Sequence, residues 1–191
     1  MGTAVLREGE YRRVPWKNGG GTTLEVAACP SADGDGFDWR VSVADVAFEG
    51  PFSAFPGVDR VITLVDGDGM VLSVDGVEHR LAPLEPFAFP GDAITACRLP
   101  GGPARDLNLM TRRGRTAGRV RVVGVAGVLD LDCASDETLL VLPVDGGIAL
   151  GGDDGRAAPP GRLDCVRQDG TGPLRLRGRG RVVEIRVAPA R

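Results

Sequence analysis

Histidine is nearly absent from this sequence, because His79 is the only one among 191 residues. A catalytic triad or a cysteine–histidine pair would have to use that one imidazole, and a site with two histidine ligands for zinc, iron or copper cannot be assembled. The four cysteines are too widely spaced for a Cys-x-x-Cys redox or zinc motif. We therefore expect a protein without a bound metal or other cofactor.

Several other signatures are missing as well. The sequence contains no Walker A loop, no complete Gly-x-Gly-x-x-Gly fingerprint and no Gly-x-Ser-x-Gly elbow. No apolar run approaches eighteen residues, and the first residues do not resemble a signal peptide. The formal net charge of -3 is a poor match for a polyanion. We expect a cytoplasmic protein that binds neither nucleic acid nor a membrane, and a homodimer is left open.

The sequence is rich in residues that interrupt secondary structure, with 29 glycines and 14 prolines. They leave little room for a helix of ten residues or more. Residues 37–43 alternate apolar and polar side chains, which is the period of a β-strand. Many short strands separated by turns are typical of a sandwich or barrel, so we predict an all-β fold. The predicted strands are 22–28, 37–43, 60–65, 70–74, 94–99, 105–110, 119–126, 138–142, 147–150, 162–167 and 181–187.

A weak internal repeat suggests two related halves. The sequence Val-Asp-Gly at 65–67, followed by an apolar stretch, resembles the Val-Asp-Gly at 144–146 and the stretch after it. The offset of 79 residues predicts two β-units of about eighty residues, divided near residues 111–116. Chance similarity between Val-Asp-Gly turns is the alternative.

Lysine is as rare as histidine. Lys17 is the only one, whereas arginine supplies every other cationic side chain. An ammonium differs from a guanidinium in geometry and in how readily its pKa shifts on burial, so Lys17 looks selected for its chemistry. It is followed by Asn18 and by three glycines whose backbone N–H groups could form an anion-binding concavity. A solvated lysine beside a tight turn is the alternative.

The other candidate polar residues lie within the first 110 positions. Arg40 and Ser42 share one strand face, and Asp106 and Asn108 share another. Arginine, lysine and amide donors suit a small carboxylate ligand. A buried salt-bridge network that fixes strand register is the alternative. The predicted ligand-binding residues are Lys17, Asn18, Glu25, Arg40, Ser42, Arg60, Asp106 and Asn108.

Five segments of this chain, in order, resemble the HutD/Ves family. They are Trp-Lys-Asn-Gly-Gly-Gly-Thr-Thr-Leu-Glu at 16–25, Phe-Asp-Trp-Arg-Val-Ser-Val-Ala-Asp-Val at 37–46, Gly-Pro-Phe-Ser-Ala-Phe-Pro-Gly-Val-Asp-Arg at 50–60, Phe-Ala-Phe-Pro-Gly-Asp at 87–92 and the segment 105–114. The resemblance implies a bicupin, two jelly-roll units in one chain. Residues 1–113 would form the cupin unit that carries these motifs, and residues 114–191 a degenerate one.

The resemblance also implies a bacterial protein linked to histidine utilisation. The ligand it implies is a small acid such as formylglutamate or urocanate. Our leading hypothesis is a metal-independent binder of such an anion, with an accessory or regulatory role and no catalytic residue. The alternative is a metal-free isomerase or lyase that uses Lys17 as base, or Glu25 and Asp106 as acid and base.

Overall fold

The computed structural model describes residues 2–16, 19–34, 36–151 and 159–190. These residues form fifteen β-strands and a single 3-10 turn, η1 (Glu8–Glu10), so the all-β prediction is confirmed. Within the described residues no helix is long and apolar enough to cross a membrane. Two compact units are present, one of residues 12–117 with 190, and one of residues 2–11 with 118–189.

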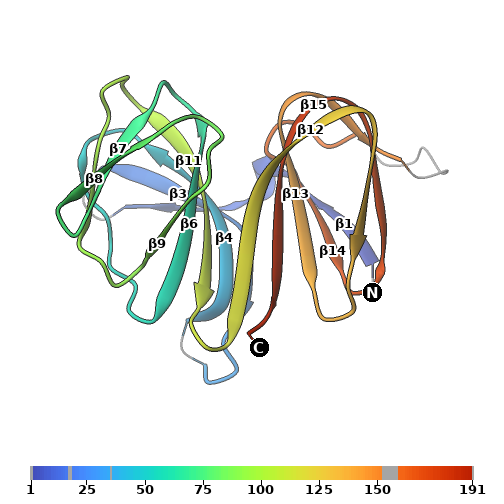
Figure 1. The fold of residues 1–191 in the computed structure, drawn as a ribbon, viewed down its shortest axis with the longest axis horizontal. Coiled ribbons are helices and arrows are strands. Elements are labelled where there is room, and N and C mark those ends of the chain that lie inside the picture. The colour runs from blue at the N-terminus through green and yellow to red at the C-terminus, as the bar shows by residue number, and fades with distance from the viewer. Residues whose placement is uncertain (1, 17–18, 35, 152–158, 191) are drawn as a thin grey trace. The chain divides into compact units, whose positions relative to one another are not determined.

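The unit of residues 12–117, here called the pocket unit, contains two antiparallel sheets. In Figure 1 its strands run from blue through green to yellow. The six-stranded sheet has the order β2 (Arg12–Pro15), β3 (Gly21–Pro30), β4 (Phe37–Val46), β11 (Ala104–Arg112), β6 (Val58–Asp66) and β9 (Phe87–Pro90). The four-stranded sheet has the order β5 (Gly50–Pro51), β10 (Thr95–Arg98), β7 (Met70–Val74) and β8 (Val77–Leu81).

One face of the six-stranded sheet changes from apolar to polar along its strands. On β4, the positions of one face are Ala44 and Val46 toward the C-terminal end, and Arg40 and Ser42 before them. Because alternate residues of a strand share a face, one strand supplies both the core and the polar groups. The apolar core of this unit comprises Ala44, Val46, Ile62, Leu64, Met70, Leu72, Leu81, Phe89, Cys97, Leu99 and Ala104.

The second unit is one five-stranded sheet. Its order is β1 (Gly2–Leu6), β14 (Cys165–Asp169), β13 (Thr138–Leu150), β15 (Gly172–Pro189) and β12 (Thr116–Cys133). Its core is aliphatic and includes Leu139, Val141, Val166 and Leu176. The pairing of β1 with β14 runs from Gly2 opposite Asp169 to Leu6 opposite Cys165.

Residues 2–11 therefore join the second unit, whereas the sequence-based division placed them in residues 1–113. Asp164 holds this segment: it accepts hydrogen bonds from the Glu8 backbone N–H and the Arg7 guanidinium, both at 2.7 Å. The Tyr11 hydroxyl donates to the Leu163 carbonyl at 2.8 Å. No local pattern in the sequence encodes a pairing between residues more than 150 positions apart.

The internal repeat does not correspond to two equivalent turns. Residues 67–69 connect β6 to β7, with Gly67 and Gly69 at positive φ. Residues 144–146 instead lie inside the continuous strand β13, where the pairing with β15 shifts between Pro143 and Asp145. The same tripeptide ends a strand and enters a turn in one unit, and lies at a bulge in the other.

Gly21, the last glycine of the run, has a steric role. It begins β3, and a Cβ atom there would lie 2.3 Å from the Asp45 carbonyl oxygen and 3.2 Å from the Trp16 ring. We expect Gly21→Ala to lower the free energy of unfolding by about 1–3 kcal/mol, because the backbone oxygen cannot move away. Urea denaturation checks this, with Gly124→Ala as control, since a Cβ at Gly124 has no heavy atom within 4 Å. Equal stability of the two variants would contradict the steric interpretation.

Candidate functional site

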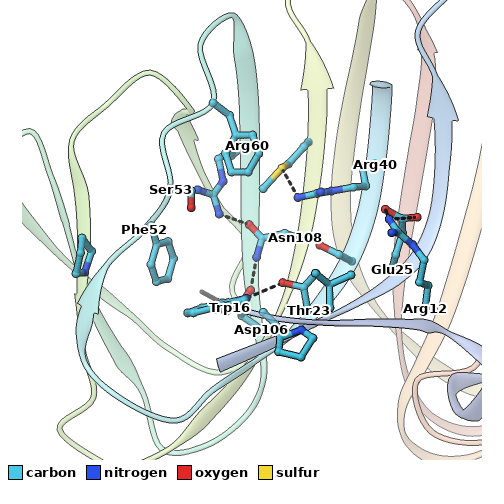
Figure 2. A pocket seen from close by; sticks show the side chains of 17 residues that line it. Arg12, Trp16, Thr23, Glu25, Arg40, Phe52, Ser53, Arg60, Asp106 and Asn108 are labelled. Atoms are coloured by element: carbon cyan, nitrogen blue, oxygen red, sulfur yellow. Dashed lines mark hydrogen bonds and ion pairs between the residues drawn. The ribbon is translucent and has the colours of Figure 1, made fainter. Parts of the chain in front are cut away.

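A cavity of about 650 Å³ opens in the pocket unit, and Figure 2 shows the side chains around it. Its walls come from β2, β3, β4, β6 and β11 of the six-stranded sheet and from the segment 51–55. The lining residues are Arg12, Val14, Pro15, Trp16, Thr23, Glu25, Arg40, Ser42, Ala44, Pro51, Phe52, Ser53, Phe55, Arg60, Asp106, Asn108 and Met110.

Sheet register builds this site in rows, because directly opposite residues of antiparallel strands project from the same face. Met110 on β11 lies opposite Arg40 on β4 and Arg60 on β6. Two residues back along β11, Asn108 lies opposite Ser42, and Ser42 lies opposite Glu25 on β3. Strands far apart in sequence thus bring their polar residues into two neighbouring rows.

A third row carries the acidic group. Two residues further back along β11, Asp106 lies opposite Ala44, which lies opposite Thr23. Asp106, Asn108 and Met110 are thus alternate residues of β11 and share one face of the sheet. Six predicted ligand-binding residues therefore line one pocket: Glu25, Arg40, Ser42, Arg60, Asp106 and Asn108. Lys17 and Asn18 lie outside the described residues.

Arg60 is a buried cation, with only 5% of the residue exposed. Its Nη2 donates to Asn108 Oδ1 at 2.8 Å, and its guanidinium carbon lies 4.8 Å from the centre of the Phe89 ring and 5.5 Å from that of Phe52. Burial lowers the pKa of Arg60 to about 10; the Asp106 charge opposes this shift and the Arg40 charge adds to it. Within the described residues its Nε has no hydrogen-bond partner.

Arg40 has a similar environment. Its Nη2 contacts Met110 Sδ at 3.4 Å, and its guanidinium carbon lies 5.1 Å from the centre of the Phe37 ring and 5.5 Å from that of Phe55. Burial lowers its pKa, which the Glu25 carboxylate partly offsets. Its Nε is buried and without a hydrogen-bond partner among the described residues. Two desolvated guanidinium groups therefore keep an unused donor each.

Asp106 is the counterpart of these cations. It is 1% exposed, and its Oδ1 accepts a hydrogen bond from Asn108 Nδ2, so that Asn108 connects Asp106 to Arg60 (Figure 2). Burial raises the pKa of Asp106 to about 7; Arg60 opposes this shift, Asp45 adds to it and the hydrogen bond from Asn108 opposes it. Its Oδ2 has no partner within the described part of the chain. The carboxyl thus has one free oxygen.

Two further pairs complete the walls. Arg12 Nη2 donates to both carboxylate oxygens of Glu25 at 3.1 Å, so Glu25 is already paired with a cation from the neighbouring strand. Trp16 Nε1 donates to Thr23 Oγ1 at 2.8 Å, which orients the indole at the pocket wall. Glu25 is therefore less available to a ligand than Asp106.

The sequence-based prediction missed several of these lining groups. Arg12 belongs to β2, a four-residue strand that was not predicted, and the Phe52 and Phe55 rings come from a segment between the predicted strands 37–43 and 60–65. The scarcity of aromatic residues, only two tryptophans and six phenylalanines, was a usable signal for the rings. Nothing in the local sequence distinguishes Arg12 from the other arginines.

Among the described residues, no group of three or more His, Cys, Asp or Glu side chains is placed to hold a metal ion. The unused groups of the pocket are instead guanidinium donors and one carboxyl oxygen. Such groups suit an organic ligand held by hydrogen bonds and charge.

The fold and this site define a class: a two-unit β protein of the bicupin type, with a donor-rich basic pocket in one unit. The HutD family model matches residues 8–183, and the chain belongs to the HutD family. The predicted family and the predicted bicupin fold are both confirmed. A protein from Escherichia coli of the DUF861 family, at 10% identity and a TM-score of 0.72, covers 98% of this chain and 90% of its own, and shares the fold alone.

The more similar relatives are bacterial. The chain is 37% identical over 185 residues to an uncharacterised 21.2 kDa protein of the hutC 3' region of Pseudomonas putida, covering 95% of this chain and 96% of that protein. It is 44% identical over 118 residues to protein Ves of Citrobacter koseri, covering 59% of this chain and 61% of Ves. HutD from Pseudomonas fluorescens SBW25, in a formate condition, is 38% identical over the full length of both chains, with a TM-score of 0.86.

Proposed function

We propose that this chain binds a small carboxylate metabolite in the pocket, without a metal, and serves an accessory or regulatory role in histidine or related amino-acid catabolism. The observation that carries the proposal is a pair of desolvated guanidinium groups, that of the half-buried Arg40 and that of the buried Arg60. Neither forms an ion pair with a carboxylate of the described residues, and each keeps an unpartnered Nε. A buried cation is costly unless it is paired, and a bound carboxylate would supply the partner.

Pocket size and lining support a metabolite rather than a macromolecule. A volume of about 650 Å³ lies within the range of small-molecule sites, roughly 300–1,000 Å³. Aromatic rings against the guanidinium groups exclude water and strengthen their interaction with an anion. The pocket is therefore built for a small organic acid.

The comparisons favour a ligand from histidine breakdown. The Pseudomonas putida relative belongs to the hutC 3' region, and the Pseudomonas fluorescens HutD structure names formate, the simplest carboxylate. We propose formylglutamate or urocanate, or an acid similar to them, as the ligand. We expect the protein to act in the cytoplasm without nucleic acid or a membrane, and a homodimer stays a prediction.

A binding measurement tests the site directly. We expect N-formylglutamate or urocanate to bind the parent protein and to bind Arg40→Met about 10–100-fold more weakly, the usual range for a lost hydrogen bond to a charged group. Isothermal titration calorimetry gives both dissociation constants. Arg98→Met is the matched control, because Arg98 is an exposed arginine of the same unit that pairs with Glu78. Unchanged affinity in folded Arg40→Met would refute the proposed role of this guanidinium.

One observation favours an enzyme as the second candidate. The raised pKa of Asp106, about 7, is typical of a general acid or base that works near neutral pH. Glu25, the other predicted acid or base, is held by Arg12 instead. Incubation of the parent with urocanate and N-formylglutamate, followed by proton NMR, decides between the two functions. Product formed in excess over protein would establish turnover and overturn the binding role.

A further inference from the structure

The pocket contains an unpartnered hydrogen-bond acceptor as well as unpartnered donors, and this combination restricts the class of ligand that can bind. Three buried side-chain atoms at its wall lack partners among the described residues: Arg40 Nε, Arg60 Nε and Asp106 Oδ2. The first two can only donate hydrogen bonds. An ionised Asp106 can only accept them, and Asn108 already occupies its other oxygen.

We infer that Asp106 Oδ2 forms a second subsite, which accepts a hydrogen bond from an N–H group of the ligand. The inference rests on the proposed function, because the carboxylate of the same ligand occupies the arginine subsite. The ligand class is then a carboxylate that also carries an amide or azole N–H. A carboxylate ligand without such an N–H would leave Asp106 Oδ2 buried without a partner, which weakens binding.

The hydrogen-bonded residues between the two subsites limit how far apart the carboxylate and the N–H of the ligand can be. Arg60, Asn108 and Asp106 form one hydrogen-bonded chain, and Asn108 lies between the other two (Figure 2). Two hydrogen bonds of about 3 Å and one amide group span roughly 8 Å at most. Both subsites are therefore close enough for the carboxylate and the N–H of one small ligand to reach them together. Asn108 orients both subsites and is expected to act as a positioning residue.

The carboxylate and the N–H of such a ligand have opposite effects on the pKa of Asp106. A carboxylate alone would raise the pKa of Asp106 further and favour its neutral form. A donated N–H favours the charged form instead. The charge of Arg60 on β6 and the hydrogen bond from Asn108 on β11 favour the charged form of this carboxyl, and the charge of Asp45 on β4 disfavours it. A ligand that supplies both an anion and a donor thus binds with little net change in the charge of Asp106.

An amide and its ester isostere test this subsite. N-formylglutamate carries the N–H, and 2-(formyloxy)glutarate replaces it by an oxygen at nearly the same size. We expect the parent to bind the amide at least about tenfold more tightly than the ester at pH 8, because a buried acceptor left unpaired is costly. Isothermal titration calorimetry with both probes measures the ratio.

Asp106→Asn is the variant that isolates the acceptor. Its amide oxygen can still accept from Asn108, while its amide nitrogen now faces the ligand. We expect the preference for N-formylglutamate to fall to about onefold or to invert, with ester binding retained through Arg40 and Arg60. Equal affinity of the parent for the two probes, or an unchanged amide preference in the variant, would overturn the second subsite and leave the carboxylate site standing. Failure of both probes to bind the parent would overturn the carboxylate site and the second subsite together.

Discussion

Arg60→Met is expected to abolish carboxylate binding while making the ligand-free protein more stable. Arg60 is hydrogen-bonded to Asn108 and packed on the Phe52 and Phe89 rings, so its removal should weaken binding of N-formylglutamate by more than about 100-fold. The free energy of unfolding should rise by about 1–3 kcal/mol, because an apolar side chain replaces a desolvated charge. The buried Arg60 charge would then cost stability in the free protein, and the bound carboxylate would offset that cost.

Two measurements separate this expectation from a structural role for Arg60. Urea denaturation gives the stability, and calorimetry gives the affinity. Arg60→Lys keeps the charge but loses the planar fork, so its affinity should lie between those of the parent and Arg60→Met. If Arg60→Met instead loses about 3 kcal/mol or more of stability, Arg60 belongs to a buried network that fixes strand register, the alternative raised from the sequence.

Raising the pH from 4 to 7 is expected to destabilise the ligand-free protein through Asp106. Its pKa is about 7 in the folded protein and near the ordinary 3.8 in the unfolded chain. Between these values the folded state keeps a proton that the unfolded state has released, so stability falls as pH rises and levels off above about 7. The loss approaches about 4 kcal/mol if the whole shift is realised.

Asp106→Asn should remove this pH dependence, because asparagine is a neutral isostere of the protonated acid. We expect the variant and the parent to match at pH 4 and the variant to be more stable at pH 8. Asp92→Asn is the control, for which we expect the opposite change in stability. Hydrogen bonds from the Gly57 backbone N–H and from Arg113 lower the pKa of Asp92. Removing the Asp92 charge should therefore lower the stability above pH 4. Parallel pH profiles for the parent and Asp106→Asn in urea denaturation would show that Asp106 is ionised throughout.

Much of the candidate site could be predicted because strand periodicity is local. The alternation within 37–43 places Arg40 and Ser42 on one face, and the same rule places Asp106 with Asn108; in the structure all four line the pocket. The rarity of lysine also pointed to the first part of the chain as the place of the chemistry. Lys17, the most unusual of these residues, lies outside the described part of the chain, and its role stays a prediction.

Sequence alone determined the all-β class, the side-chain faces of the long strands and most of the polar groups, since each depends on neighbours a few residues away. Tertiary structure decided which strands meet, because register is set by contacts between distant segments. Only that register places Met110 between Arg40 and Arg60, and brings Arg12 to Glu25. The chemistry of Asp106 was decided there too, since its raised pKa comes from burial, and burial belongs to the folded chain.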